Sequence, residues 1–236
     1  MKYFFNLEET RCEKIISQLK IGEDKFVSDF KRVIKEIENN YNQFYKTSFK
    51  ENDTLESFQR FVDLNLPYLE EQEKEKLEGE ISIDEVWHAL YGFQNDKTPG
   101  DNGFTKEFYE AFFDLLDNAL LESFNSGFQN GQLSVSQKRG IISLIPKDEN
   151  NSITLSNWRP VTLLNVDYKT LAKVIAKRIQ SVLPKLIHSD QTGFTKGRCI
   201  GQNVRLLADI LEYTDVKKIP GILLFIDFEK AFDTIE

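Results

Sequence analysis

The sequence predicts an α+β fold that is rich in helix, and three observations support that expectation. Apolar residues recur at three- and four-residue intervals through much of the first 137 residues, which is the pattern of amphipathic helices. Two apolar runs, 139–146 and 158–164, flank a polar stretch and predict a β-hairpin. Five consecutive apolar residues, Ile222 to Ile226, follow Pro220-Gly221 and predict a short strand buried on both faces.

Length and composition set the first limits. The 236 residues suffice for one large domain or two modest ones, and a hydrophobic content of 40% is enough to build a core. No apolar run approaches the roughly 18 residues needed to span a membrane, and the opening MKYFFNLEETR turns acidic too early for a signal peptide. Cys12 and Cys199 lie far apart without metal-ligand spacing. We therefore expect a reduced, intracellular protein with no membrane partner and no zinc.

Charge is distributed unevenly along the chain. The net charge of −8 by itself argues against nucleic-acid binding. However, residues 1–137 carry 15 Lys and Arg against 27 Asp and Glu, whereas residues 138–205 carry 12 against 4, a net charge of +8. The basic segment 138–205 is therefore the part expected to face nucleic acid.

The first part of the chain is expected to be helical. The predicted helices cover 8–20, 25–49 and 54–64. The aromatic stripe of 25–49 is far more often core than a base-stacking platform. The charged run 70–80 is expected to be a solvated surface or linker. Ser82 and Glu85 form a capping box that predicts the start of a further helix.

A loop and a core helix follow. Residues 97–104, KTPGDNGF, place Pro-Gly next to Asn-Gly and predict a turn in which positive φ is available. Thr105 then begins a strongly apolar helix that is expected to reach about Phe124.

The predicted hairpin brings two cations to its tip. Lys147 lies at the turn and Arg159 on the returning strand. Such a pair suits a triphosphate. Surface Lys and Arg are more often only solubilising, so the residues alone leave both interpretations open.

Residues 165–184 predict an amphipathic helix with a row of cations. Lys169, Lys173 and Lys177 recur every four residues and lie on one face. A solvated face is one interpretation. Because like charges at this spacing repel each other, a helix that follows a nucleic-acid backbone is the other, and we favour it.

The stretch 191–198, QTGFTKGR, is too rich in glycine and charge for a core element. Gln191 and Arg198 can donate hydrogen bonds to phosphate or sugar, and Gly193 permits close approach of another backbone. A helix is expected from Cys199 to Tyr213.

The predicted strand 222–226 ends at Asp227. A carboxylate beside such an apolar run needs a cation, a hydrogen-bond donor or water to compensate its charge. At strand-to-helix junctions in general, an aspartate most often caps the helix that follows, here FEKAFDTIE. Asp233, six residues later, is turned about 240° away on such a helix, and we expect it to be structural.

Five blocks in this order, PGDNGF, LIPK, NWRPVTLLN, QTGFTKGR and DFEKAFD, resemble the reverse transcriptases of LINE-type, non-LTR retrotransposons, and together they extend over nearly the whole chain. The resemblance implies that Asp227 binds the two catalytic Mg²⁺ ions, and that Phe232 excludes a ribose 2′ hydroxyl. It implies that Lys147 and Arg159 hold the phosphates of the incoming dNTP, and that 191–198 contacts template and primer. Carboxylate oxygens are the ligands that Mg²⁺ prefers.

The sequence also departs from the family pattern. Asp101 stands where the family usually has Pro, and Asn102 where it usually has Asp. Family members carry a second catalytic motif, aromatic-x-Asp-Asp, which these 236 residues lack. Since one carboxylate cannot hold two Mg²⁺ ions, we expect no polymerisation by this chain alone.

The resemblance implies a domain organisation and a function. Residues 1–96 form a helical N-terminal extension, and 97–236 form the fingers and the start of the palm of a right-hand polymerase, which is incomplete. The function is template-directed nucleotidyl transfer with an RNA template, a DNA primer and dNTPs. The remainder of a polyprotein, an endonuclease before and palm and thumb after, is a further partner. The alternatives are a decayed, non-catalytic RNA-binding remnant that uses 138–205, and a helical interaction protein built on 1–137.

Overall fold

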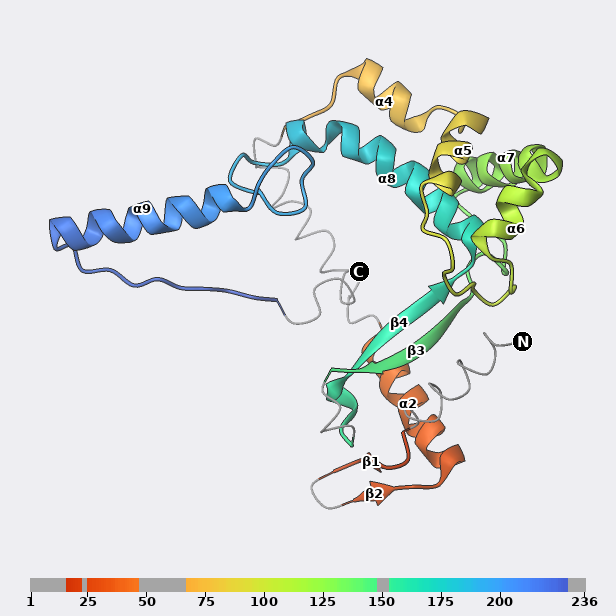
Figure 1. Ribbon diagram of the computed structural model, residues 1–236, viewed down its shortest axis with the longest axis horizontal. Helices are drawn as coiled ribbons and strands as arrows, with labels where there is room; N and C mark the ends of the chain where they lie inside the picture. Colours follow the sequence, from red (N-terminus) through yellow and green to blue (C-terminus); the bar gives the residue numbers. More distant parts are fainter. Residues whose placement is uncertain (1–15, 23–24, 47–66, 148–152, 229–236) are drawn as a thin grey trace, which may run out of the picture. The chain divides into compact units, whose positions relative to one another are not determined.

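The computed structural model describes residues 16–22, 25–46, 67–147 and 153–228, which belong to two compact units (Figure 1). The first unit contains residues 1–54, 140–163 and 230–236, and the second contains 55–139 and 164–229. The mixture of helices with two small sheets agrees with the α+β class. No helix in the described ranges is long and apolar enough to cross a membrane.

The first unit combines two small sheets with one helix. Strands β1 (Leu19–Lys20) and β2 (Phe26–Val27) pair in antiparallel fashion. Helix α2 (Phe30–Phe44) begins after Asp29, whose carboxylate accepts a hydrogen bond from the backbone N–H of Arg32 at 3.0 Å. Strands β3 (Gly140–Pro146) and β4 (Trp158–Leu164) form the second sheet.

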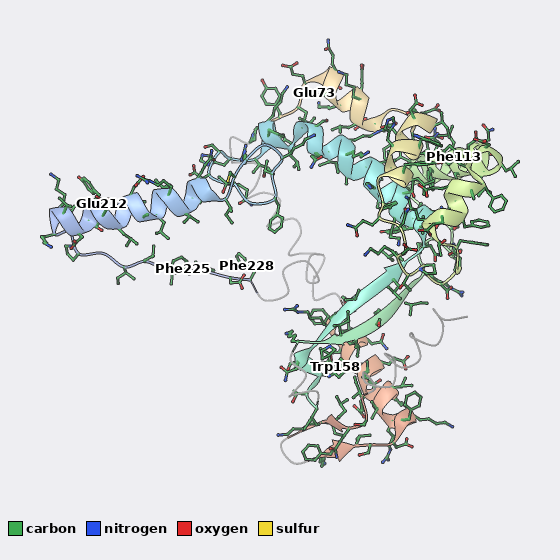
Figure 2. The ribbon with its side chains drawn as sticks, viewed as in Figure 1. Glu73, Phe113, Trp158, Glu212, Phe225 and Phe228 are labelled. Atoms are coloured by element: carbon green, nitrogen blue, oxygen red, sulfur yellow. The ribbon has the colours of Figure 1, made fainter. Side chains whose placement is uncertain are left out.

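The hairpin of β3 and β4 has the bounds that alternation and turn residues predict, to within one residue. Its turn is closed by the backbone N–H of Lys147, which donates to the carbonyl of Asn157 at 2.6 Å. A short 3₁₀ helix, η2 (Leu155–Asn157), leads into β4. Trp158, labelled in Figure 2, is only 4% exposed, so the first residue of β4 is buried.

The second unit is helical. Its helices are α4 (Glu71–Glu78), α5 (Ile83–Tyr91), α6 (Lys106–Ala111), α7 (Phe113–Asn130), α8 (Val166–Leu186) and α9 (Gly201–Lys217). Side chains of α5, α6, α7 and α8 form one hydrophobic core with Ile81, and α8 packs along α4 and α5 (Figure 1). Residues before and after position 96 therefore share this core. The domain boundary predicted between residues 96 and 97 stays a prediction.

Local signals located several helix ends correctly. The capping box is confirmed, since the Ser82 hydroxyl accepts from the N–H of Glu85 and the Glu85 carboxylate accepts from the N–H of Ser82. Helix α8 starts after Asn165 and ends two residues beyond the predicted Pro184. The predicted helix 105–124 begins correctly after Thr105, but it is broken at Phe112 into α6 and α7, without Gly or Pro at the break, and α7 ends at Asn130, before Gly131, rather than at Phe124.

Other expectations for the first part of the chain need correction. Leu19 and Lys20, expected to end a helix, form β1, because they pair with β2. The helix expected from Lys25 begins only at Phe30, since Asp29 caps it. The charged run 70–80 is exposed as expected but is a helix, α4, rather than a linker. The predicted helix 54–64 and most of 8–20 lie outside the described residues.

The buried strand predicted at 222–226 is not observed. Residues 219–228 have no regular secondary structure, Ile222 is 97% exposed, and Phe225 and Phe228 project from an extended backbone (Figure 2). A strand requires a hydrogen-bonded neighbour, and no strand in the described ranges pairs with this segment. The apolar side chains of α9 are likewise largely uncovered.

Candidate nucleic-acid interface

Asp227, the predicted metal ligand, lies on the exposed segment that follows α9. In the described part of the chain, no group of three His, Cys, Asp or Glu residues is arranged to hold a metal ion. The residues that the structure describes therefore do not form a two-metal site. Phe232 and Asp233 lie outside the described residues.

Lys147 and Arg159 flank the turn of the hairpin. The backbone N–H of Lys147 donates to the carbonyl of Asn157, two residues before Arg159. The side chains of Lys147 and Arg159 are exposed, and neither forms a hydrogen bond or ion pair with a described residue. Among the described residues, the hairpin therefore offers two exposed cations near its turn.

The loop 97–104 packs against the start of α8. Gly100 is buried there, and a Cβ at this position would lie 2.3 Å from the Asn165 side-chain oxygen, so only glycine fits. The same oxygen accepts from the N–H of Asn102 at 3.1 Å, and the Asn165 amide donates to the carbonyl of Ser136 at 2.9 Å. Asn165 is fully buried and thus joins the PGDNGF block to NWRPVTLLN.

The lysine row predicted on α8 does not form one open strip. The Lys173 amine lies 4.0 Å from the centre of the Phe93 ring, and burial, followed by the charges of Lys177 and Lys106, lowers its pKa. The Lys177 amine donates to the carbonyl of His88 at 3.2 Å. Two of the three lysines thus contact α5 or the residues just after it, which follows from the packing of α8 on α5.

Arg178, beside this row, is a structural residue. Its guanidinium binds both carboxylate oxygens of Glu85, at 2.7 and 2.8 Å, and donates to the carbonyls of Leu77, Gly79 and Glu80. The hydrogen bonds from Arg178 lower the pKa of Glu85 to about 2. Arg178 therefore holds α8 to the α4–α5 connection.

The loop 191–198 is braced from within by Arg198. The guanidinium donates to the carbonyls of His188 and Gln191 through Nη1, and to those of Pro184 and Ile187 through Nη2. These four bonds engage both Nη groups inside the chain, so the structure gives Arg198 a loop-forming role that the sequence did not predict. Its predicted contact with phosphate stays a prediction.

The tip of this loop is open. The Gln191 side-chain amide donates to the carbonyl of Gly193 at 3.3 Å. A Cβ added at Gly193 would meet nothing within 4 Å, so another backbone has room to approach there.

Sequence reasoning missed Phe194. This side chain is 100% exposed at the tip of the braced loop, and its backbone has a φ of +58°. A left-handed conformation is costly for a residue with a Cβ, and exposure of a whole phenyl ring is also unfavourable. The signal that could have revealed it is a phenylalanine within a basic, glycine-rich stretch that has no core to join.

Comparison with known proteins gives one family match and two relatives. Residues 145–236 match the family described as reverse transcriptase (RNA-dependent DNA polymerase). The chain is 39% identical over 171 residues to the "Transposon TX1 uncharacterized 149 kDa protein" of Xenopus laevis, covering 72% of this chain and 13% of that protein. It is 27% identical over 192 residues to the "Probable RNA-directed DNA polymerase from transposon X-element" of Drosophila melanogaster, covering 76% of this chain and 21% of that protein.

Proposed function

We propose that this chain, whose residues 145–236 match the reverse transcriptase family, is part of an RNA-directed DNA polymerase of a non-LTR retrotransposon. The resemblance seen in the five ordered blocks is confirmed by the family match and by the two transposon relatives. The chain spans only 13% and 21% of the length of those relatives. The activity, substrates and partners of the whole protein therefore belong to the proposal.

One observation carries the proposal above the others. The family match begins at Ile145, at the end of β3, and runs through Glu236. It therefore covers the hairpin tip, the 191–198 loop and the DFEKAFD block in one continuous stretch. Lys147 and Arg159, which flank the turn and have no partner among the described residues, support a role in holding the triphosphate of a dNTP, because Lys and Arg bind phosphate oxygens.

The proposed reaction is template-directed transfer of a nucleotide to a primer 3′ hydroxyl, with an RNA template, a DNA primer and dNTPs. Reverse transcriptases use divalent metal ions, and we propose Mg²⁺, with Asp227 as one ligand. Phe232 is proposed to exclude the ribose 2′ hydroxyl. Gln191, Gly193 and Arg198 are proposed to lie along template and primer, and Lys169 is proposed to contact a nucleic-acid backbone. For Lys173 and Lys177, whose amines contact the Phe93 ring and the His88 carbonyl, contact with a nucleic-acid backbone stays a prediction from the sequence.

Primer extension tests this proposal. The assay uses the whole open reading frame that contains this chain, with an RNA template, a DNA primer and dNTPs. We expect Asp227→Ala to abolish extension, while the matched control Asp215→Ala, which replaces an exposed aspartate of α9 paired with Lys218, retains it. Extension that survives Asp227→Ala would overturn the assigned role. Absence of any extension by the unmodified protein would count against the polymerase itself.

The 236 residues alone are expected not to extend a primer, because Asp227 is the single metal ligand assigned in them. Extension by this chain in isolation would contradict that expectation. An intracellular location, and an endonuclease, palm and thumb elsewhere in a polyprotein, stay predictions. The non-catalytic remnant is not favoured by the family match or by the relatives.

A further inference from the structure

A pocket of about 290 Å³ lies in the second unit where the end of α5, the start of α6 and the first turn of α8 meet. Three lysines from separate parts of the chain line it, namely Lys97, Lys106 and Lys169. Phe93 and Val166 supply apolar wall. The pocket is therefore a cationic hollow with partly apolar walls, built by residues up to 77 positions apart.

Two of the three lysines that line this pocket have no counter-ion among the described residues. The third, Lys106, is mostly buried; its amine pairs with Glu110 at 2.7 Å and donates to the side-chain oxygen of Asn95 at 2.5 Å. The amines of Lys97 and Lys169 form no hydrogen bond or ion pair with any described residue. A fourth lysine, Lys173, covers the Phe93 ring, and its pKa is lowered by burial and then by the charges of Lys177 and Lys106.

The positive charges around the pocket favour an anion. Like charges held close together repel each other, and the repulsion is larger beside apolar walls than in water. A nearby anion turns the same charges into attraction, and Arg or Lys clusters of this kind bind phosphate. The pocket therefore has the charge and the room for a phosphate group.

The start of α8 forms part of the pocket wall. Val166, its first residue, lines the pocket. The side chain of the preceding residue, Asn165, does not cap the helix, because its oxygen accepts from Asn102 and its amide donates to Ser136. Asp167, in the first turn, accepts from the N–H of Tyr168 at 2.8 Å and offsets part of the partial positive charge of the helix start, so the attraction for an anion comes from the lysines.

We propose that this pocket, lined by Lys97, Lys106 and Lys169, binds one backbone phosphate of an RNA strand. The inference rests on the proposed function, because RNA is the polyanion that such a polymerase binds. It also changes the interface expected from sequence. Lys169 acts with two lysines from α6 and the preceding loop rather than as part of a row with Lys177, whose amine is bonded to the carbonyl of His88.

The test compares a double variant with a charge-matched control. The double variant Lys97→Gln, Lys169→Gln removes the two unpaired cations and leaves the buried Lys106 in place. The control Lys76→Gln, Lys185→Gln removes the same charge from α4 and from the last turn of α8, away from the pocket. Binding of a fluorescein-labelled RNA of 20 nucleotides is measured by anisotropy at several salt concentrations, with circular dichroism to verify folding.

We expect the pocket variant to bind RNA about tenfold more weakly than the control variant at low salt. We also expect the plot of log K, where K is the association constant for RNA, against log salt concentration to become less steep. The magnitude of its negative slope should decrease by about 0.7, the value for one phosphate contact on a single strand. Equal RNA affinity of the pocket and control variants would refute the proposal that this pocket binds RNA, while leaving the proposed function intact. Failure of the unmodified chain to bind RNA would overturn both.

A second measurement identifies the source of the phosphate. The extent of chemical acetylation at each lysine is measured by mass spectrometry for the protein alone, with RNA, and with inorganic pyrophosphate. RNA at concentrations near its Kd is expected to protect Lys97 and Lys169 from acetylation. Pyrophosphate at the same phosphate concentration is expected to leave their acetylation unchanged. Equal protection by pyrophosphate would assign the pocket to a small phosphate ligand and overturn the proposal of an RNA strand.

Discussion

Replacement of Arg178 by Gln tests the joint between α8 and the α4–α5 connection. The change removes a bidentate ion pair with Glu85 and leaves the carbonyls of Leu77, Gly79 and Glu80 without their donor. We expect the second unit to lose stability, with the loss concentrated where α4, α5 and α8 meet.

The magnitude follows from the pKa of Glu85. A fall from 4.5 to about 2 corresponds to about 3.4 kcal/mol at full strength, and since both side chains keep some contact with water, roughly half of that is expected. Three carbonyls that lose a charged donor add a similar amount after hydration. Arg178→Gln should therefore lower the free energy of unfolding by roughly 3 kcal/mol.

The same pair predicts a pH dependence. The pKa of Glu85 is lower in the folded state, so its contribution is fully present above pH 4.5 and is lost as the pH falls from 4.5 toward 2. Stability of the unmodified chain should decline through that window, and Arg178→Gln should flatten the decline.

Urea unfolding followed by circular dichroism at pH 7 and at pH 3 measures both effects, and hydrogen exchange locates the loss. Arg139→Gln is the control, because its ion pair with Asp101, at 3.6 Å, is exposed and should contribute less than about 0.5 kcal/mol. If Arg178→Gln and Arg139→Gln destabilise the chain equally, the structural role of Arg178 is refuted.

Two further predictions concern the backbone. Gly100→Ala should lower the free energy of unfolding, measured in urea, by roughly 2 kcal/mol or more, because the new Cβ would lie 2.3 Å from the Asn165 side-chain oxygen. Gly103→Ala is the control: its Cβ would meet open space, and its φ of +75° should lower the free energy of unfolding by only about 1 kcal/mol. Equal losses would contradict the close approach at Gly100. Phe194→Gly should leave stability unchanged or raise it by up to about 1 kcal/mol, since glycine relieves the φ of +58° and no buried contact is lost. A clear loss of thermal stability in Phe194→Gly would show that the ring packs on the protein.

Sequence patterns succeeded where the cause of a structure lies within a few residues. The capping box of Ser82 and Glu85 was predictable because its two hydrogen bonds join positions three apart. The hairpin 140–146 and 158–164 followed from apolar runs around a polar turn. The start of α8 after Asn165 followed from the onset of helical periodicity.

Sequence patterns gave wrong predictions where the local structure depends on pairing with another segment of the chain. The apolar run 222–226 has the composition of a buried strand, but a strand forms only where another strand pairs with it. Leu19 and Lys20 fit a helix by periodicity and instead pair with Phe26 and Val27.

The sequence by itself determined the family, through five blocks in a fixed order, and the local elements whose hydrogen bonds are short-range. Only the tertiary structure decided which groups each of these Lys and Arg side chains contacts. Periodicity placed Lys169, Lys173 and Lys177 on one face of a helix, but it could not show that α5 packs on that face. Packing engages Arg178 and Arg198 with carbonyls of the chain and gathers Lys97, Lys106 and Lys169 around one pocket. The physical reason is that a repeat along the chain defines the direction of a side chain, whereas its partners come from segments that only folding brings near.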